Sequence, residues 1–366
     1  MDPGFVLSTV RALADGEEPF FAALERGSRL DVAAYAGALE RQRLMRWVEP
    51  AVLSPEGRRR LPAALVAAVE SGSDARRRRH AEVVAETLEV DDALARAGLA
   101  CRHLKGVSFG QRFYGDPRRR HQRDVDVLVR GTSRDAALAA LEAIGYAREP
   151  GVITEGVVRW GLGRGYAAVD LHWNLRRRAR RRVDAEELFA DPVGFEIGGR
   201  TLETVSDDAT LVFLLLSLCG DLRRGACGIR HLLDLHLVLR GLAPALDAEA
   251  FFERRARQRL LMPCVNVLAV FFALWRAAPE FPELAESLLR RRQLVRIRGA
   301  DEALALLTPN GNGGAGRRWF RRAYPYNVFD GWARRLTIDL GFTLSRWLPS
   351  RRFRLADAEA GELRAS

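Results

Sequence analysis

Two acidic residues, Asp124 and Asp126, stand one residue apart in the valine-rich stretch "RDVDVLVR". Its alternating pattern predicts a β-strand, on which residues i and i+2 point to the same side. The two carboxylates would then project together, while Val125 and Val127 would face the opposite layer. Adjacent carboxylates repel, so one of them would hold a proton unless a cation lies nearby. A divalent ion such as Mg²⁺ removes that conflict, because it binds carboxylate and phosphate oxygens.

A third carboxylate, Asp170, lies in "AAVDLHW", which is a second predicted apolar strand, and His172 would share its face. Two Mg²⁺ ions held by three carboxylates can clamp the attacking and leaving oxygens of a phosphoryl or nucleotidyl displacement. Mn²⁺ is the alternative ion. A D-x-D pair is also common without a metal, and its acids can pair with arginines such as Arg120, Arg123 and Arg130.

The chain has a single lysine, Lys105, in the stretch "LKGVSFGQRFYG" about 20 residues before the aspartates. The stretch predicts a short helix opened by glycine. Free backbone N–H groups at a helix start point toward phosphate, and a lysine there would add a positive charge. By contrast, we favour a structural role for His172, with a catalytic histidine as the alternative. We expect Asp234, in "RHLLDLHL", to make a helix-surface or interdomain contact.

Periodicity divides the chain into three parts: residues 1–98 and 206–366 show helical spacing, and residues 99–205 alternate strands and helices. The fold class predicted is α+β, with a small mixed sheet flanked by N-terminal and C-terminal helical regions. A glycine- and asparagine-rich loop is expected at 308–318. The predicted strands lie in "LACRHL", "RDVDVLVR", "GVITEGVVRW", "YAAVDLHW" and the hairpin "FEIGGRTLETV".

The net charge of +11 comes almost entirely from arginine, including the run at 176–182. A GC-rich genome explains this excess, and aromatic residues are not interleaved with the basic runs. Nucleic acid is therefore not the expected partner, and an RNA-directed protein is the weakest alternative. The apolar runs are too short for a membrane span. The four cysteines form no C-x-x-C pair, and with no signal peptide recognisable they fit a cytoplasmic location.

The stretch "LKGVSFGQRFYGDPRRRHQRDVDVLV", followed by "VDLHWNL", resembles a largely uncharacterised bacterial family of nucleotidyltransferases. The shared elements are an L-K-G segment, a Y-x-D-P turn, an arginine four residues before the first aspartate, a D-x-D-x-L-V strand and a D-L-H-W strand. The family belongs to the DNA polymerase β-like superfamily, which includes the aminoglycoside nucleotidyltransferases. The resemblance implies that Asp124, Asp126 and Asp170 bind the metal ions and are catalytic.

The resemblance also implies a phosphate site. Lys105 and Gly106 would lie where the superfamily cradles the triphosphate, and Ser108 would stand for the serine of its G-S pair, one residue later than usual. Arg120 would neutralise phosphate or hold the D-x-D strand in place.

The function expected on this basis is transfer of a nucleoside monophosphate from an NTP to a hydroxyl or similar group. The acceptor is open: a small molecule, a sugar, a peptide or a protein would fit. The alternative is a non-catalytic protein of the same fold that binds a nucleotide or another anion.

Overall fold

The computed structural model describes residues 1–27, 30–154, 157–162, 168–173, 186–224, 226–297 and 299–307. The loop expected at 308–318 and the arginine run at 176–182 lie outside these residues.

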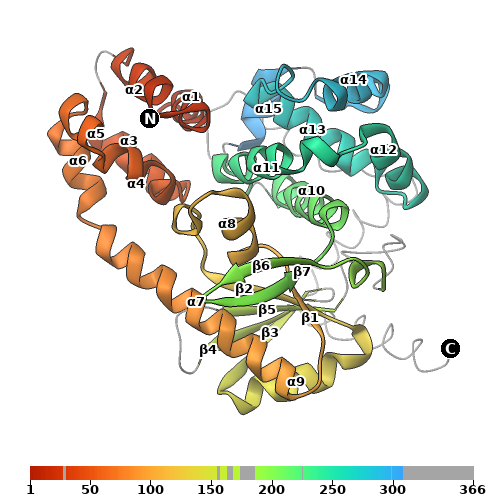
Figure 1. Ribbon diagram of the computed structural model, residues 1–366. Coiled ribbons are helices and arrows are strands. Elements are labelled where there is room, and N and C mark those ends of the chain that lie inside the picture. Colours follow the sequence, from red (N-terminus) through yellow and green to blue (C-terminus); the bar gives the residue numbers. More distant parts are fainter. Residues whose placement is uncertain are drawn as a thin grey trace.

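The centre of the fold is a five-stranded mixed sheet with strand order β1-β2-β5-β4-β3 (Figure 1). Strands β2 and β5 are parallel, and the other neighbours are antiparallel. A separate hairpin is formed by β6 and β7. The strands are β1 (Cys101–His103), β2 (Asp124–Val129), β3 (Tyr146–Thr154), β4 (Val157–Leu162), β5 (Ala168–His172), β6 (Val193–Ile197) and β7 (Arg200–Thr204). The predicted mixed α+β class is confirmed.

One strand prediction was wrong. "GVITEGVVRW" was expected to be one strand, but the segment belongs to two, because β3 ends at Thr154 and β4 begins at Val157. The two strands pair antiparallel, with Thr154 opposite Val157. Apolar residues precede and follow the stretch Thr154-Glu155-Gly156, so the sequence pattern did not indicate that the chain reverses between two strands. The hairpin around Gly198 and Gly199 is confirmed, and both glycines have positive φ.

Helices precede and follow the sheet. Before it come α1 (Pro3–Asp15), α2 (Glu17–Glu25), α3 (Val32–Arg41), α4 (Met45–Leu53), α5 (Pro55–Arg60), α6 (Ala63–Glu70) and α7 (Ser73–Arg96). Between the strands lie α8 (Val107–Phe113) and α9 (Arg134–Ala143). After it come α10 (Asp207–Arg224), α11 (Ile229–Leu242), α12 (Ala248–Arg257), α13 (Leu261–Trp275), α14 (Pro282–Arg290) and α15 (Ala300–Leu307). None of the helices within the described ranges is long and apolar enough to cross a membrane.

The two faces of the sheet have different partners. Val125, Val127 and Val129 of β2 pack into an apolar cluster with residues of α7 and α9, and α7 runs beside the sheet in Figure 1. On the other face, Leu128 packs with Phe213 of α10. The side of β2 that carries the aspartates therefore faces the C-terminal helices.

The helices from the two ends of the chain share one large apolar core. It contains Val10 and Leu39 from the first helices together with Leu235 and Phe271 from the last. Helix α8 reaches this core through Phe109. Packing on α8 and α10 therefore fixes the position of the sheet relative to the C-terminal helices.

Candidate active site

The first element of the site is a pair of carboxylates on neighbouring parallel strands. Asp126 of β2 and Asp170 of β5 are register partners. Because Val125 and Val127 pack on the α7 side, alternation along the strand sends Asp126 to the α10 side. Asp126 is only 5% exposed. The strand geometry inferred from the sequence thus brings these two acids together.

His172 completes a three-residue group with this pair. Its Nε2 lies 3.2 Å from Oδ1 of Asp126, and its ring meets that of Phe213 edge-on. Ligand atoms of Asp126, Asp170 and His172 all lie within 4.8 Å of one another. Asp124, two residues earlier on the same strand, is opposite Ala168 and is not part of that group. The structure therefore gathers two of the three expected aspartates, with a histidine that was interpreted as structural.

Lys105 supplies a positive charge to the same place. Its Nζ is 3.4 Å from Oδ1 of Asp126 and lies over the ring of Phe213. Burial alone would lower the pKa of Lys105, but Asp126 and then Asp124 outweigh it and raise that pKa. The only lysine of the chain thus stays charged beside a buried acid.

The pKa of Asp126 is lowered. Burial works against this shift, and the charge of Lys105 together with the hydrogen bond from His172 outweighs it. The carboxylate is therefore ionised at neutral pH, which is the state that a metal ligand requires.

Gly106 starts α8 in a conformation that requires glycine. Its φ of 56° and ψ of −118° fall in a region that side-chain-bearing residues rarely adopt. A Cβ at this position would lie 3.5 Å from the carbonyl oxygen of Asp124. Helix α8 therefore begins directly beside the D-x-D strand. The hydroxyl of Ser108 is fully buried and donates to the carbonyls of Leu104 and Lys105, so it closes the first turn.

Arg120 forms a buried ion pair that joins the sheet to the C-terminal helices. Its Nε and Nη2 donate to Asp234 of α11 at 2.8 and 3.0 Å. The hydroxyl of Tyr114 donates to the same carboxylate at 2.7 Å. The remaining nitrogen, Nη1, donates to the carbonyl oxygen of Gly106 at 3.2 Å. Of the two roles considered for Arg120, these contacts favour holding the strand and the start of α8 in place.

Asp234 of α11 thus contacts residues of the segment that leads into β2. It is 2% exposed, so the helix-surface alternative does not apply. Sequence reasoning missed its partners Arg120 and Tyr114, because no local pattern links residues more than 110 positions apart. The only available signal was an acid within an otherwise apolar helical run.

A second group, Asp91, Cys101 and His103, also has ligand atoms within 4.8 Å of one another. It lies on α7 and β1, on the face of the sheet opposite to Asp126. Asp91 already pairs with Arg200 at 3.1 Å, and its Oδ1 is 3.0 Å from Nε2 of His103. The negative charge of Asp91 is thus balanced by Arg200 and His103 within the protein.

Comparison with known proteins identifies a family for the chain. The family model described as "Uncharacterised nucleotidyltransferase" matches residues 30–276. No curated protein matches the chain.

Two solved structures of ANT(2'')-Ia show a distant similarity. One is the solution structure of this antibiotic-resistance factor, and the other is a crystal structure in complex with adenylyl-2''-tobramycin. Each is 17% identical to this chain, with a TM-score of 0.35. Each match covers 48% of this chain, and it covers 89% of the solution structure and 96% of the crystal structure. Similarity at this level assigns no role to any residue here.

The matched range covers more than half of the chain, including β2, β5, α8 and α11. This chain therefore belongs to the uncharacterised nucleotidyltransferase family.

Proposed function

We propose that this protein transfers a nucleoside monophosphate from an NTP to a hydroxyl or similar group of an acceptor. The observation that supports this most is the buried Asp126, ionised and aligned with Asp170 across two parallel strands, in a chain of the nucleotidyltransferase family. Such an enzyme works mainly by positioning its substrates and neutralising charge.

The donor atoms fit a divalent ion. Asp126 and Asp170 offer carboxylate oxygens and His172 offers an imidazole nitrogen within one small space. We propose that Asp126 and Asp170 hold Mg²⁺, with Asp124 as the third carboxylate on the same strand face. Two bound ions would neutralise charge on the transferred phosphate and polarise the attacking hydroxyl. Mn²⁺ would suit the imidazole better than Mg²⁺ does.

The residues around the carboxylates would bind and orient the NTP. Lys105 would place its ammonium against phosphate oxygens, and Gly106 would let the phosphates approach the start of α8 closely. Ser108 would support this turn through its bonds to backbone carbonyls. Arg120 would hold the turn through Gly106 while keeping its ion pair with Asp234. A cytoplasmic location fits this use of NTP.

A non-catalytic binding protein remains the second candidate, and one contact favours it. The ammonium of Lys105, 3.4 Å from Asp126, already supplies positive charge where a metal would otherwise supply it. A protein that used this lysine in place of metal would bind the NTP without turnover.

A thermal-shift screen with each NTP, with and without Mg²⁺, tests the proposal. Ligand present at 100 times its Kd stabilises the native state by about 2.7 kcal/mol. We expect a Mg²⁺-dependent rise with at least one NTP that is lost in Asp126→Asn, and pyrophosphate release when acceptors are supplied. A shift that is independent of Mg²⁺ and unchanged in Asp126→Asn would refute the enzyme and favour the binding protein.

A further inference from the structure

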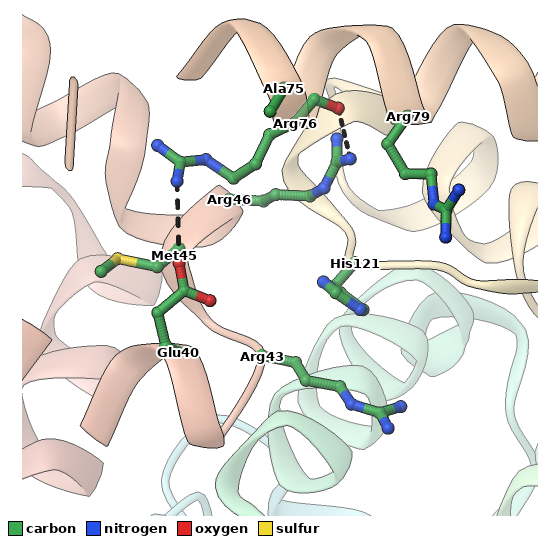
Figure 2. Close-up of a pocket in the computed structure, with 8 residues that line it drawn as sticks. All are labelled: Glu40, Arg43, Met45, Arg46, Ala75, Arg76, Arg79 and His121. Carbon is green, nitrogen blue, oxygen red and sulfur yellow. Dashed lines mark hydrogen bonds and ion pairs between the residues drawn. The ribbon is translucent and has the colours of Figure 1, made fainter. Parts of the chain in front are cut away.

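An arginine-lined pocket lies beside the candidate active site. Its volume is about 220 Å³, and it is lined by Glu40, Arg43, Met45, Arg46, Ala75, Arg76, Arg79 and His121. We call it the arginine pocket. It lies between the α3–α4 junction, the start of α7 and the segment that leads into β2 (Figure 2). It is smaller than the roughly 300–1,000 Å³ of pockets for drug-sized ligands, so it suits a small group better than a whole nucleotide.

The acids near this pocket do not balance its arginines. Arg76 is the arginine whose charge is met best: its Nε lies 2.5 Å from Glu49, and Glu40 is 3.8 Å from its Nη1. Glu40 is the one acid among the lining residues. Three further arginines share the same space, and one of them, Arg79, lies 3.7 Å from Glu82.

Arg46 is the most unusual of these, because it is a buried cation. It is 5% exposed, and its guanidinium donates to the backbone carbonyls of Arg118 and Arg76. Within the part of the chain that the structure describes, it forms no ion pair with a carboxylate. Burial is the main reason that its pKa is lowered; the charge of Glu49 opposes that shift, and the charges of Arg76 and Arg79 add to it. A buried charge without a directly paired carboxylate is costly, and a bound anion would offset that cost.

His121 and Arg43 offer further polar groups. Nε2 of His121 is buried and has no hydrogen-bond partner among the described residues. The side chain of Arg43 makes no hydrogen bond or ion pair with any described residue. In Figure 2, Arg46 and Arg79 lie above His121 and Arg43 lies below it. The pocket thus presents donors from several sides, which is the arrangement that phosphate oxygens need.

The pocket is also close to the start of β2, the strand that carries Asp124 and Asp126. His121 precedes Asp124 by three residues, a span of at most about 10 Å. The charge of Arg43 also interacts with that of Asp124. The pKa of Arg43 is lowered by burial and by the charges of Arg230 and Arg123, whereas Asp124 and Asp221 oppose that shift.

We propose that the arginine pocket binds a phosphoryl group carried by one of the two substrates of the transfer. This inference rests on the proposed function. The phosphoryl group is either the end of the NTP triphosphate or a phosphate on the acceptor. In the second case the acceptor is a phosphorylated molecule, whose phosphate sits in the pocket while its hydroxyl reaches the carboxylates.

Arg43 permits a test that does not disturb the fold. It follows α3 with a φ of +58°, where its N–H bonds to Glu40 and the N–H of Leu44 bonds to Leu39. This is a helix-ending turn that usually carries glycine. Arg43→Gly therefore removes the side chain from the pocket and relieves backbone strain, and it should melt at or above the wild-type temperature.

Arg259 is a matched control. It follows α12 in the same kind of turn, also with a φ of 58°, and its N–H and that of Leu260 make the equivalent bonds. Among the described residues, its side chain makes no hydrogen bond or ion pair. Arg259→Gly thus repeats the backbone change of Arg43→Gly without touching the pocket.

Calorimetric titration with inorganic pyrophosphate in EDTA tests the pocket without metal. We expect wild type and Arg259→Gly to bind with the same affinity within twofold, and Arg43→Gly to bind at least tenfold more weakly. No binding by wild type, or equal binding by Arg43→Gly, would overturn the proposal.

A second titration, with Mg²⁺ and the NTP, identifies the source of the phosphoryl group. A parallel loss of NTP affinity in Arg43→Gly assigns the pocket to the triphosphate, whereas unchanged NTP affinity assigns it to the acceptor. If the proposed function were wrong but the pocket existed, the wild type would bind pyrophosphate and would not bind the NTP.

Discussion

The buried ion pair between Arg120 and Asp234 should be the costliest polar contact to break near the site. Asp234→Ala removes a carboxylate that accepts from Arg120 at 2.8 and 3.0 Å, from Tyr114 at 2.7 Å and, more distantly, from Arg230 at 3.4 Å. Arg120 is 4% exposed, so water cannot replace the lost partner. Breaking a buried pair from one side typically costs about 3–5 kcal/mol. The substitution also leaves the Tyr114 hydroxyl without its acceptor. We therefore expect the free energy of unfolding to fall by about 4 kcal/mol in total.

Urea denaturation, followed by both fluorescence and circular dichroism, measures this loss. Asp247→Ala is the control, because it also removes an acid from a C-terminal helix but only an exposed cap, on Ala250. Loss of such a cap costs about 1 kcal/mol. The double variant Arg120→Met/Asp234→Leu should recover much of the stability, because no buried charge is left alone. If Asp234→Ala cost no more than Asp247→Ala, the ion pair would not hold the two regions together.

The same pair carries a pH dependence. The pKa of Asp234 is lowered because the charges of Arg120 and Arg230 outweigh its burial. The unfolded carboxyl has a pKa near about 3.9. A depressed folded pKa gives stability that is complete above that value and is lost as the pH falls toward the folded pKa. The difference between wild type and Asp234→Ala should therefore shrink as the pH falls below about 4.

Three further predictions concern the start of α8 and the core of the C-terminal helices. Gly106→Ala should destabilise the fold by about 1–3 kcal/mol in urea, because its φ of 56° with a ψ of −118° disfavours a side chain; a neutral result would contradict the backbone placement. Ser108→Ala should change NTP affinity less than threefold in a calorimetric titration, because its hydroxyl bonds to backbone carbonyls; a tenfold loss would show direct phosphate contact. Burial lowers the pKa of His236 to about 4, so stability should be full above about 6.5 and fall between there and about 4, by up to about 3 kcal/mol. Thermal melts should show a smaller acid loss for His236→Leu, and an equal loss would refute the assignment.

The carboxylate pair was predictable because its signal is local. Alternation of valine and aspartate in β2 fixes which side chains share a face, and "AAVDLHW" repeats the pattern in β5. Their register, with Asp126 opposite Asp170, depends on how the strands pair and is not encoded in either stretch. The glycine start of α8 was equally readable, because few other residues adopt the conformation of Gly106.

The contacts that hold the site together could not be predicted. Arg120 stands in a run of three arginines, and nothing in that run marks it as the one buried against Asp234. The arginine pocket likewise joins Arg46 to His121, which are far apart in the chain. Because arginine is abundant throughout the chain, the sequence does not distinguish the arginines whose positions are specific.

Binding of Mn²⁺ tests for the metal site at Asp126 and Asp170 without any knowledge of the acceptor. Electron paramagnetic resonance of free Mn²⁺ would be followed while protein and a non-hydrolysable NTP analogue are added. We expect wild type to remove the free-ion signal in the presence of the analogue, and Asp126→Asn to leave the signal unchanged while keeping the same circular dichroism spectrum. Equal Mn²⁺ binding by wild type and Asp126→Asn would contradict a metal site at Asp126 and Asp170.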